Sequence, residues 1–73
     1  MEEKDTMQII AKNIVRIRKK KKLSQEQLAF EAKINRTYMG YIENAKYNIT
    51  IGMLEKVAKA LNCSLVDLIT EKE

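Results

Sequence analysis

The chain has 73 residues with two glycines, one cysteine, no proline and no histidine, and its formal net charge is +4. A chain this short can bury only one small core, so we expect one domain over residues 1–73, and the scarcity of Gly and Pro disfavours a β-rich fold. The lone Cys63 and the absence of histidine leave neither a disulfide framework nor a zinc site.

Apolar residues recur at helical spacing in the first part of the chain and predict a helix that begins near Asp5 or Thr6. Asp5 and Gln8 stand at the spacing of a capping box, in which two residues satisfy each other's free amides. The stripe expected to face the core is Met7, Ile10, Ala11, Ile14 and Ile17. A basic block follows, made of Arg16, Arg18, Lys19, Lys20, Lys21 and Lys22. The block fits either a solvated helix end or a phosphate-facing patch.

Capping residues divide the rest of the chain into four shorter helices. Ser24 with Gln27 opens a helix over about residues 25–32, and Asn35 caps the next over about 36–44. Thr50 opens the fourth helix, and Ser64 with Asp67, at the spacing of a capping box, opens the fifth. The apolar stripe of the fourth predicted helix is Met53, Leu54, Val57, Ala58 and Leu61, and the fifth carries Leu65, Leu68 and Ile69. The sequence therefore predicts an all-α fold of five helices, with a helix-turn-helix at about residues 24–44.

The third predicted helix has two different faces. At about 100° per residue, Tyr38, Met39 and Ile42 fall on a side apolar enough to dock on the bundle. The opposite arc is polar and consists of Arg36, Thr37, Gly40, Tyr41 and Asn44.

Gly40 stands in the middle of the polar arc, where a glycine costs about 1 kcal/mol relative to alanine. An arc that presses against another surface explains the glycine, because a missing side chain lets the backbone approach closely. Arg36 can bond a guanine edge, Thr37 a thymine methyl or a phosphate, and Tyr41 a base edge or the sugar-phosphate. We therefore expect this helix to lie in the major groove of double-stranded DNA. Packing of Gly40 against another helix is the alternative.

Two further contacts are expected around this helix. Gln25 stands at a helix start, where outward amides favour a phosphate, so it is a candidate for the DNA backbone; an ordinary exposed residue is the alternative. Glu43 falls at the border of the inner face and needs a partner there. Arg18 is the candidate, and the pair would orient the third helix.

Four stretches of the sequence together resemble one known family. They are IR (17–18), LSQEQLA (23–29), YMGYIEN (38–44) and TIGMLEKVAKAL (50–61). They are similar to the XRE helix-turn-helix family of phage repressors and Cro. The resemblance implies a five-helix, lambda-repressor-like domain that binds operator DNA as a dimer and inserts its third helix into the major groove.

The resemblance also assigns roles by position. Gln25 matches the phosphate-binding glutamine, Arg36, Thr37 and Tyr41 match base-reading positions, and Arg18 with Glu43 matches an interhelical ion pair. The positions near the DNA backbone fall on Asn35, Tyr38, Asn44 and Lys46. The sequence departs from the family at Lys22, Lys33 and Ala45, where glycine is usual and a positive φ is frequent.

The small size and the Asn-Arg-Thr-Tyr start of the third helix also resemble controller proteins of restriction–modification systems. This likeness implies a homodimeric autoregulator that binds a palindromic operator; a phage-type repressor is the alternative. In activating relatives an acidic residue just after the glutamine touches RNA polymerase, and Glu26 holds that position. A first-turn acid favoured by the helix dipole is its other role.

A single helix-turn-helix reads only a short half-site, so we expect a homodimer that pairs through the last two predicted helices. The last helix offers more apolar residues than the core needs. Val66 and Ile69 are therefore the candidates for the dimer interface, unless the whole helix completes the core.

Other classes of function find less support. With no histidine, no phosphate loop and no cluster of carboxylates, we expect neither an enzyme nor a bound cofactor or metal. An antitoxin- or antirepressor-like protein-interaction module stays open and would expose a large apolar patch. No apolar run approaches transmembrane length, so we expect no membrane association and a cytoplasmic protein. The family resemblance implies a bacterial or phage origin.

Overall fold

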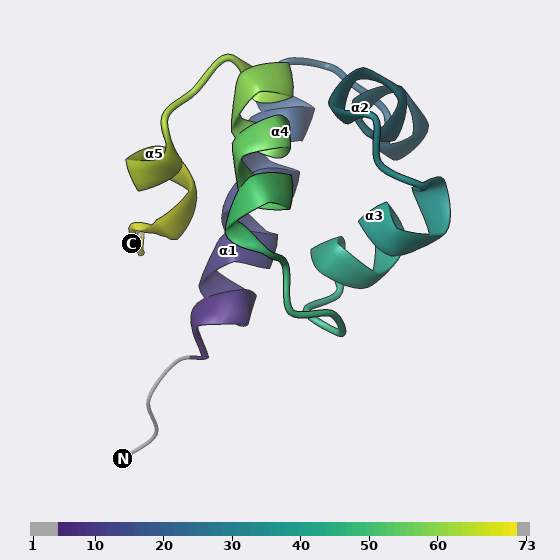
Figure 1. Ribbon diagram of the computed structural model, residues 1–73. Helices are drawn as coiled ribbons and strands as arrows, with labels where there is room; N and C mark the ends of the chain where they lie inside the picture. Colours follow the sequence, from purple (N-terminus) through teal and green to yellow (C-terminus); the bar gives the residue numbers. More distant parts are fainter. Residues whose placement is uncertain (1–4, 72–73) are drawn as a thin grey trace.

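Between residues 5 and 71, the range that the computed structural model describes, five α-helices surround a hydrophobic core and no strand is present (Figure 1). The helices are α1 (Thr6–Lys20), α2 (Gln25–Ala32), α3 (Arg36–Glu43), α4 (Ile51–Leu61) and α5 (Leu65–Ile69). The predicted all-α class is confirmed. Residues 1–4 and 72–73 of the expected domain lie outside the described range.

Local capping fixes where most helices begin. Ser24 Oγ accepts from the Gln27 amide at 2.9 Å, and Gln27 Oε1 accepts from the Ser24 amide at 2.7 Å. Ser64 and Asp67 form the same reciprocal box at the start of α5. These boxes confirm that residues three apart in the sequence set both helix starts.

The box predicted at Asp5 and Gln8 is wrong, although Asp5 does cap α1. The Asp5 carboxylate accepts from the nearer Met7 amide at 3.2 Å, and the Gln8 amide donates to the Asp5 backbone carbonyl at 2.9 Å. The carboxylate thus meets the second amide of the helix rather than the third. The result is a cap from one residue instead of a reciprocal pair.

Left-handed backbone conformations end several segments at residues other than glycine. Lys22, Lys33 and Ala45 have φ values of 61°, 58° and 59°, and Asn62 has 55°. The first three are the positions where the family resemblance implies glycine. Each non-glycine residue in this region costs roughly 1–2 kcal/mol, less for asparagine, so the surrounding packing must hold the turns in place.

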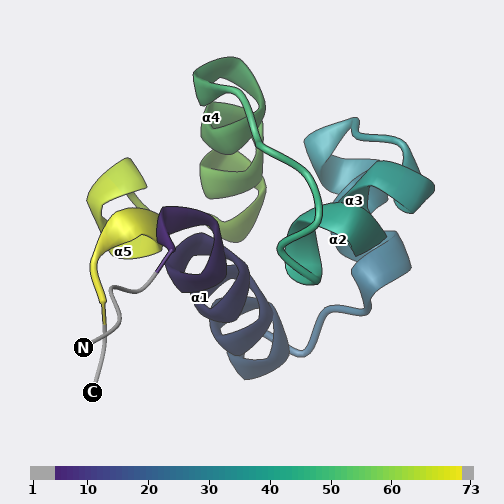
Figure 2. The ribbon, with the colours of Figure 1, turned by 90° about the horizontal axis from the view of Figure 1, so that it is seen from below.

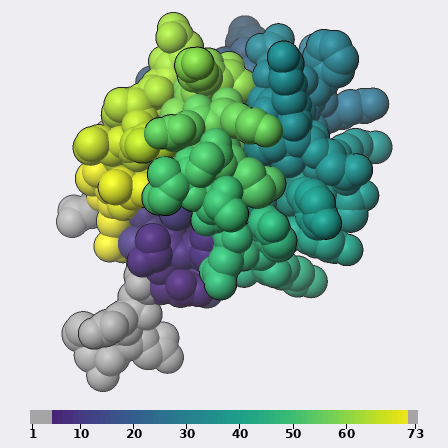
Figure 3. Space-filling view, viewed as in Figure 1, coloured from purple at the N-terminus to yellow at the C-terminus, as the bar shows by residue number. Residues whose placement is uncertain are grey.

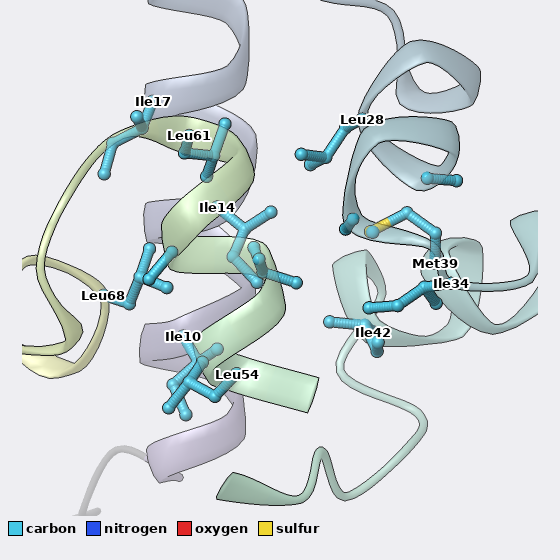
Figure 4. Packing of buried hydrophobic residues seen from close by; sticks show 14 of the residues in the cluster. Ile10, Ile14, Ile17, Leu28, Ile34, Met39, Ile42, Leu54, Leu61 and Leu68 are labelled. Atoms are coloured by element: carbon cyan, nitrogen blue, oxygen red, sulfur yellow. The ribbon is translucent and has the colours of Figure 1, made fainter. Parts of the chain in front are cut away.

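The core is built from all five helices (Figure 4). Ile14 of α1, Leu28 of α2, Met39 of α3, Leu61 of α4 and Leu68 of α5 are each fully buried. The whole predicted stripe of α1 is buried, and within the predicted stripe of α4 only Met53 remains partly exposed. Burial of these side chains supplies the main driving force for a chain of this size.

The helices are arranged so that α1 and α4 separate the remaining elements. Both ribbon views place α2 and α3 on one side of this pair and α5 on the other (Figures 1 and 2). The space-filling view likewise shows α5 at the edge away from α2 and α3 (Figure 3). A partner bound at α5 therefore leaves α3 accessible.

None of the helices in the described range is both long enough and apolar enough to cross a membrane.

Cys63 is half-buried in the turn between α4 and α5 and forms no disulfide. Burial raises the pKa of its thiol, and the nearby charge of Asp67 raises it further. The thiol is therefore neutral near pH 7 and packs as a small apolar group.

Candidate nucleic-acid interface

The turn between α2 and α3 holds the two helices at a fixed angle. Lys33 adopts the left-handed conformation, and the Ile34 amide donates to the Ala29 carbonyl at 2.9 Å. Ile34 is buried, while Asn35 caps α3 by accepting from the Thr37 amide at 2.7 Å. These contacts close α2 and open α3 within three residues, which is the connection of a helix-turn-helix.

The polar arc of α3 faces solvent and forms one wall of a shallow groove. Arg36, Thr37, Tyr41 and Asn44 are exposed, and Gly40 lies half-buried between them. The groove has a volume of about 310 Å³ and is lined by Gln25, Arg36, Thr37, Gly40, Tyr41 and Asn44. The structure thus brings the three predicted base-reading residues together on one accessible face.

Gly40 has free space in front of its α-carbon. A side-chain Cβ built there would meet only Gln25 Oε1, at 3.6 Å, which is an ordinary van der Waals distance. Packing between α2 and α3 therefore does not require glycine at this position. The alternative explanation for Gly40, packing against another helix, is therefore not supported.

A buried polar cluster ties α1, α2 and α3 together behind the groove. Arg18 Nε donates to Glu43 Oε2 at 2.8 Å, and Arg18 Nη2 donates to Glu43 Oε1 at 3.0 Å. The two side chains are 12% and 5% exposed. Arg18 Nη1 also donates to the Leu23 carbonyl at 2.9 Å, and Gln25 Nε2 donates to Glu43 Oε1 at 3.1 Å. This is the Arg18–Glu43 ion pair that the sequence suggested, extended to α2 by Gln25.

The structure places Tyr38 differently from the expectation that it docks on the bundle. Its side chain is 47% exposed and stacks on Tyr47, with ring centroids 5.2 Å apart and planes at 20°. Tyr41 lies on its other side at 6.4 Å. Tyr38 is about 60° around the helix from Tyr41, so it falls at the border of the buried face rather than within it. The α3–α4 loop supplies the ring that covers it.

The remaining residues expected near the DNA backbone are also exposed around α3. Asn44 Nδ2 donates to the Gly40 carbonyl at 2.9 Å, which fixes its side chain at the end of the groove. Asn35 is at the opposite end of the helix, with its side-chain Oδ1 engaged in the cap. The Lys46 amide donates to the Tyr41 carbonyl at 2.8 Å, and its ammonium group lies at the surface.

Two features of this region were not anticipated from the sequence. Phe30 on α2 is 83% exposed and lines a hollow with the acidic Glu26 and Glu31. Its position about 200° around α2 from the buried Leu28 was a signal that could have been used. Tyr47 gave no comparable signal, because its partner comes from another element.

Comparison with known proteins identifies the family. The helix-turn-helix family model matches residues 14–68, most of the chain. The chain belongs to the helix-turn-helix family. This helix-turn-helix protein is 41% identical to the Control protein C.SmaI of Serratia marcescens over 68 residues, which cover 93% of this chain and 81% of that one.

Solved structures agree with the sequence comparison. The fold of this helix-turn-helix protein matches that of the restriction-modification controller protein C.AhdI from Aeromonas hydrophila with a TM-score of 0.82 and 31% identity, covering 85% of this chain and 94% of that one. It matches C.Esp1396I bound to a 25 base pair operator site with a TM-score of 0.78 and 35% identity, covering 85% and 82%. The expected resemblance to XRE-type regulators and controller proteins is therefore confirmed. The family and these relatives are DNA-binding regulators rather than enzymes.

Proposed function

We propose that this helix-turn-helix protein is a controller-type transcription regulator that binds a palindromic operator as a homodimer and reads bases with α3. The observation that carries the proposal is the open groove lined by Arg36, Thr37, Gly40 and Tyr41 together with Gln25 and Asn44. A helix that enters the major groove needs an exposed face that carries hydrogen-bonding side chains at its two ends and a residue with little or no side chain at its centre. The exposed polar arc of α3, with Gly40 at its middle, meets that need.

The base-reading roles follow from the position of each side chain on α3. Arg36 is at the first position of the helix and is exposed, so its guanidinium can bond both acceptors of a guanine edge. Thr37 lies beside Arg36, and its methyl can contact a thymine methyl while its hydroxyl can bond a phosphate. Tyr41, one turn further along, can place its hydroxyl at a base edge or sugar-phosphate.

The DNA backbone would be held by residues on both sides of these readers. Gln25 lies at the first turn of α2, where the free amides and the helix dipole favour a phosphate. Asn35, Tyr38, Asn44 and Lys46 border the arc on α3 and the loop after it. Contacts of this kind set register on the duplex and carry no sequence information themselves.

The homodimer is proposed to form through α5. Val66 is 63% exposed and Ile69 is 46% exposed, while Leu68 of the same helix fills the core. Because α5 lies on the side of the molecule away from α3, pairing through it leaves both reading helices open (Figures 1 and 2). Two copies related by a two-fold axis would read a palindrome.

Activation through RNA polymerase is proposed to use Glu26. Glu26 is exposed in the first turn of α2 and shares its hollow with Phe30. An acidic residue beside an exposed aromatic ring suits a basic and apolar protein surface rather than DNA. The dipole-favouring role of Glu26 in α2 is compatible with such a contact.

A second candidate function is a protein-interaction module of the antitoxin or antirepressor kind. The specific observation that favours it is the exposure of Phe30, which no core or reading role explains. Such a module would capture one stoichiometric protein partner and would show no salt-sensitive DNA binding, unlike a regulator that neutralises phosphates.

Selection from random DNA duplexes at one fixed salt concentration tests the proposal. We expect enrichment of a palindromic motif with half-site centres about 34 Å apart. Repeating the measurement of affinity across salt concentrations should show the steep decline typical of phosphate contacts. Enrichment of no motif, or of an asymmetric one, would contradict the homodimeric regulator.

A further inference from the structure

Asn13 is a buried polar side chain in the middle of α1. It is 3% exposed and stands beside the buried apolar stripe of that helix. An unpaired amide in such a place costs several kilocalories, so its partners indicate what it does. None of the DNA-binding roles described above uses it.

The amide of Asn13 is fully engaged, and its partners lie far along the sequence. Asn13 Nδ2 donates to the Leu68 carbonyl at 2.8 Å and to the Thr70 carbonyl at 2.9 Å, 55 and 57 residues away. Asn13 Oδ1 accepts from Arg16 Nη2 at 3.2 Å. Both amide hydrogens therefore point at the end of α5, and Arg16 fixes which way the amide is turned.

The end of α5 has need of such a contact. The helix has five residues, of which Leu68 alone is fully buried, and a helix this short is marginal by itself. The last carbonyls of a helix have no partner inside it. Asn13 supplies one from α1 and so acts as a C-terminal cap that comes from another element.

We infer that Asn13 is a positioning residue for the homodimer interface: its amide clamps the end of α5 and thereby sets where Val66 and Ile69 are presented. This inference rests on the proposed homodimer through α5. Val66 and Ile69 flank the clamped Leu68 in sequence, so rotation or fraying of α5 would move both exposed side chains. Dimer affinity then depends on a residue that makes no contact across the interface.

Two substitutions test the clamp. Asn13→Asp keeps the shape and the oxygen that accepts from Arg16, but turns a carboxylate toward two carbonyls; Asn13→Leu leaves both carbonyls unpaired. We expect either change to raise the dimer dissociation constant roughly tenfold or more, measured by sedimentation equilibrium. Hydrogen exchange of the amides at residues 66–70 should accelerate, while amides of α2 and α3 stay protected. A covalently tethered dimer of Asn13→Asp should recover operator affinity.

Matched variants separate positioning from general loss of stability. Gln8→Glu makes the same amide-to-carboxylate change at an exposed site on α1. Ala29→Gly lowers stability from α2 without touching α5. If Asn13→Asp and Ala29→Gly gave the same dimer affinity and the same exchange in α5, the inference would be overturned.

Val66→Glu shows which statement has failed. If the Val66→Glu protein is monomeric and the Asn13→Asp protein still dimerises fully, only the positioning role of Asn13 is contradicted. A Val66→Glu protein that still dimerises places the interface elsewhere, and both the proposed interface and this inference then fall.

Discussion

Single residues on α3 determine what the surface offers to DNA. Arg36 lines the groove and stands exposed at the start of α3. Gly40, by contrast, contributes only the absence of a side chain. Substitutions at these two positions are therefore expected to give different experimental results.

Arg36→Ala should weaken operator binding by about 1–3 kcal/mol and relax specificity at one base pair, because a bidentate contact to a base edge is lost. The measurement is affinity for the selected operator and for its single-base variants. Lys59→Ala, which removes the same charge from the exposed face of α4, is the control and should change affinity little. An unaltered base preference in the Arg36→Ala protein would show that Arg36 does not read a base.

Gly40→Ala should stabilise the free protein by about 0.5–1 kcal/mol, because alanine is the better helix former and its Cβ fits at 3.6 Å from Gln25 Oε1. The same methyl should weaken DNA binding by holding the α3 backbone away from the groove floor. Thermal unfolding and operator affinity measure the two effects. Gly52→Ala, at an open site on α4, is the reference for helix propensity. Higher stability with undiminished affinity would show that DNA does not approach Gly40.

At the scale of the elements, the Arg18–Glu43–Gln25 cluster decides how α3 is presented. One carboxylate receives hydrogen bonds from α1 and from the first turn of α2. Shifting α3 would break contacts to both helices at once. The cluster thus links packing of the bundle to the geometry of the reading groove.

Glu43→Gln should destabilise the protein by about 3 kcal/mol, because it leaves the largely buried Arg18 guanidinium without its counter-charge. Chemical denaturation measures the loss, and Glu55→Gln on the exposed face of α4 should stay within about 0.5 kcal/mol of the parent. The double change Arg18→Met with Glu43→Leu should recover part of the stability. A Glu43→Gln protein as stable as the parent would show that the ion pair contributes nothing net.

At the scale of the whole molecule, the proposed reading surface on α3 and the proposed pairing surface on α5 lie on opposite sides of α1 and α4 (Figures 1 and 3). This separation allows one copy to bind DNA and another copy at the same time. Specificity and affinity then depend on protein concentration, since only the pair reads a full palindrome.

Val66→Glu should weaken self-association by about 2–4 kcal/mol, because it places a charge at the centre of the proposed apolar contact. Operator binding should fall to the level of a single half-site. Sedimentation and gel-shift titrations measure the two effects, and Val66→Leu should retain both activities. If a monomeric Val66→Glu protein bound the complete operator as tightly as the parent does, the two-half-site arrangement would be contradicted.

The sequence by itself determined the helices, most of their caps and the stripe of α1. The Ser24–Gln27 and Ser64–Asp67 boxes form as predicted, because each joins residues only three apart and needs no tertiary context. The Asp5 box failed within the same range, because the carboxylate is satisfied by a nearer amide. The polar arc of α3 also followed from helical periodicity alone.

Only the tertiary structure decided which partners these elements find. The stacking of Tyr38 on Tyr47, the Gln25 contact to Glu43 and the clamp from Asn13 to the end of α5 each join residues on different elements. Neither periodicity nor capping patterns report such contacts, because their geometry is set when the helices pack. The local sequence therefore specifies the helices and the polar face of α3, while burial of the shared core fixes how that face and α5 are oriented.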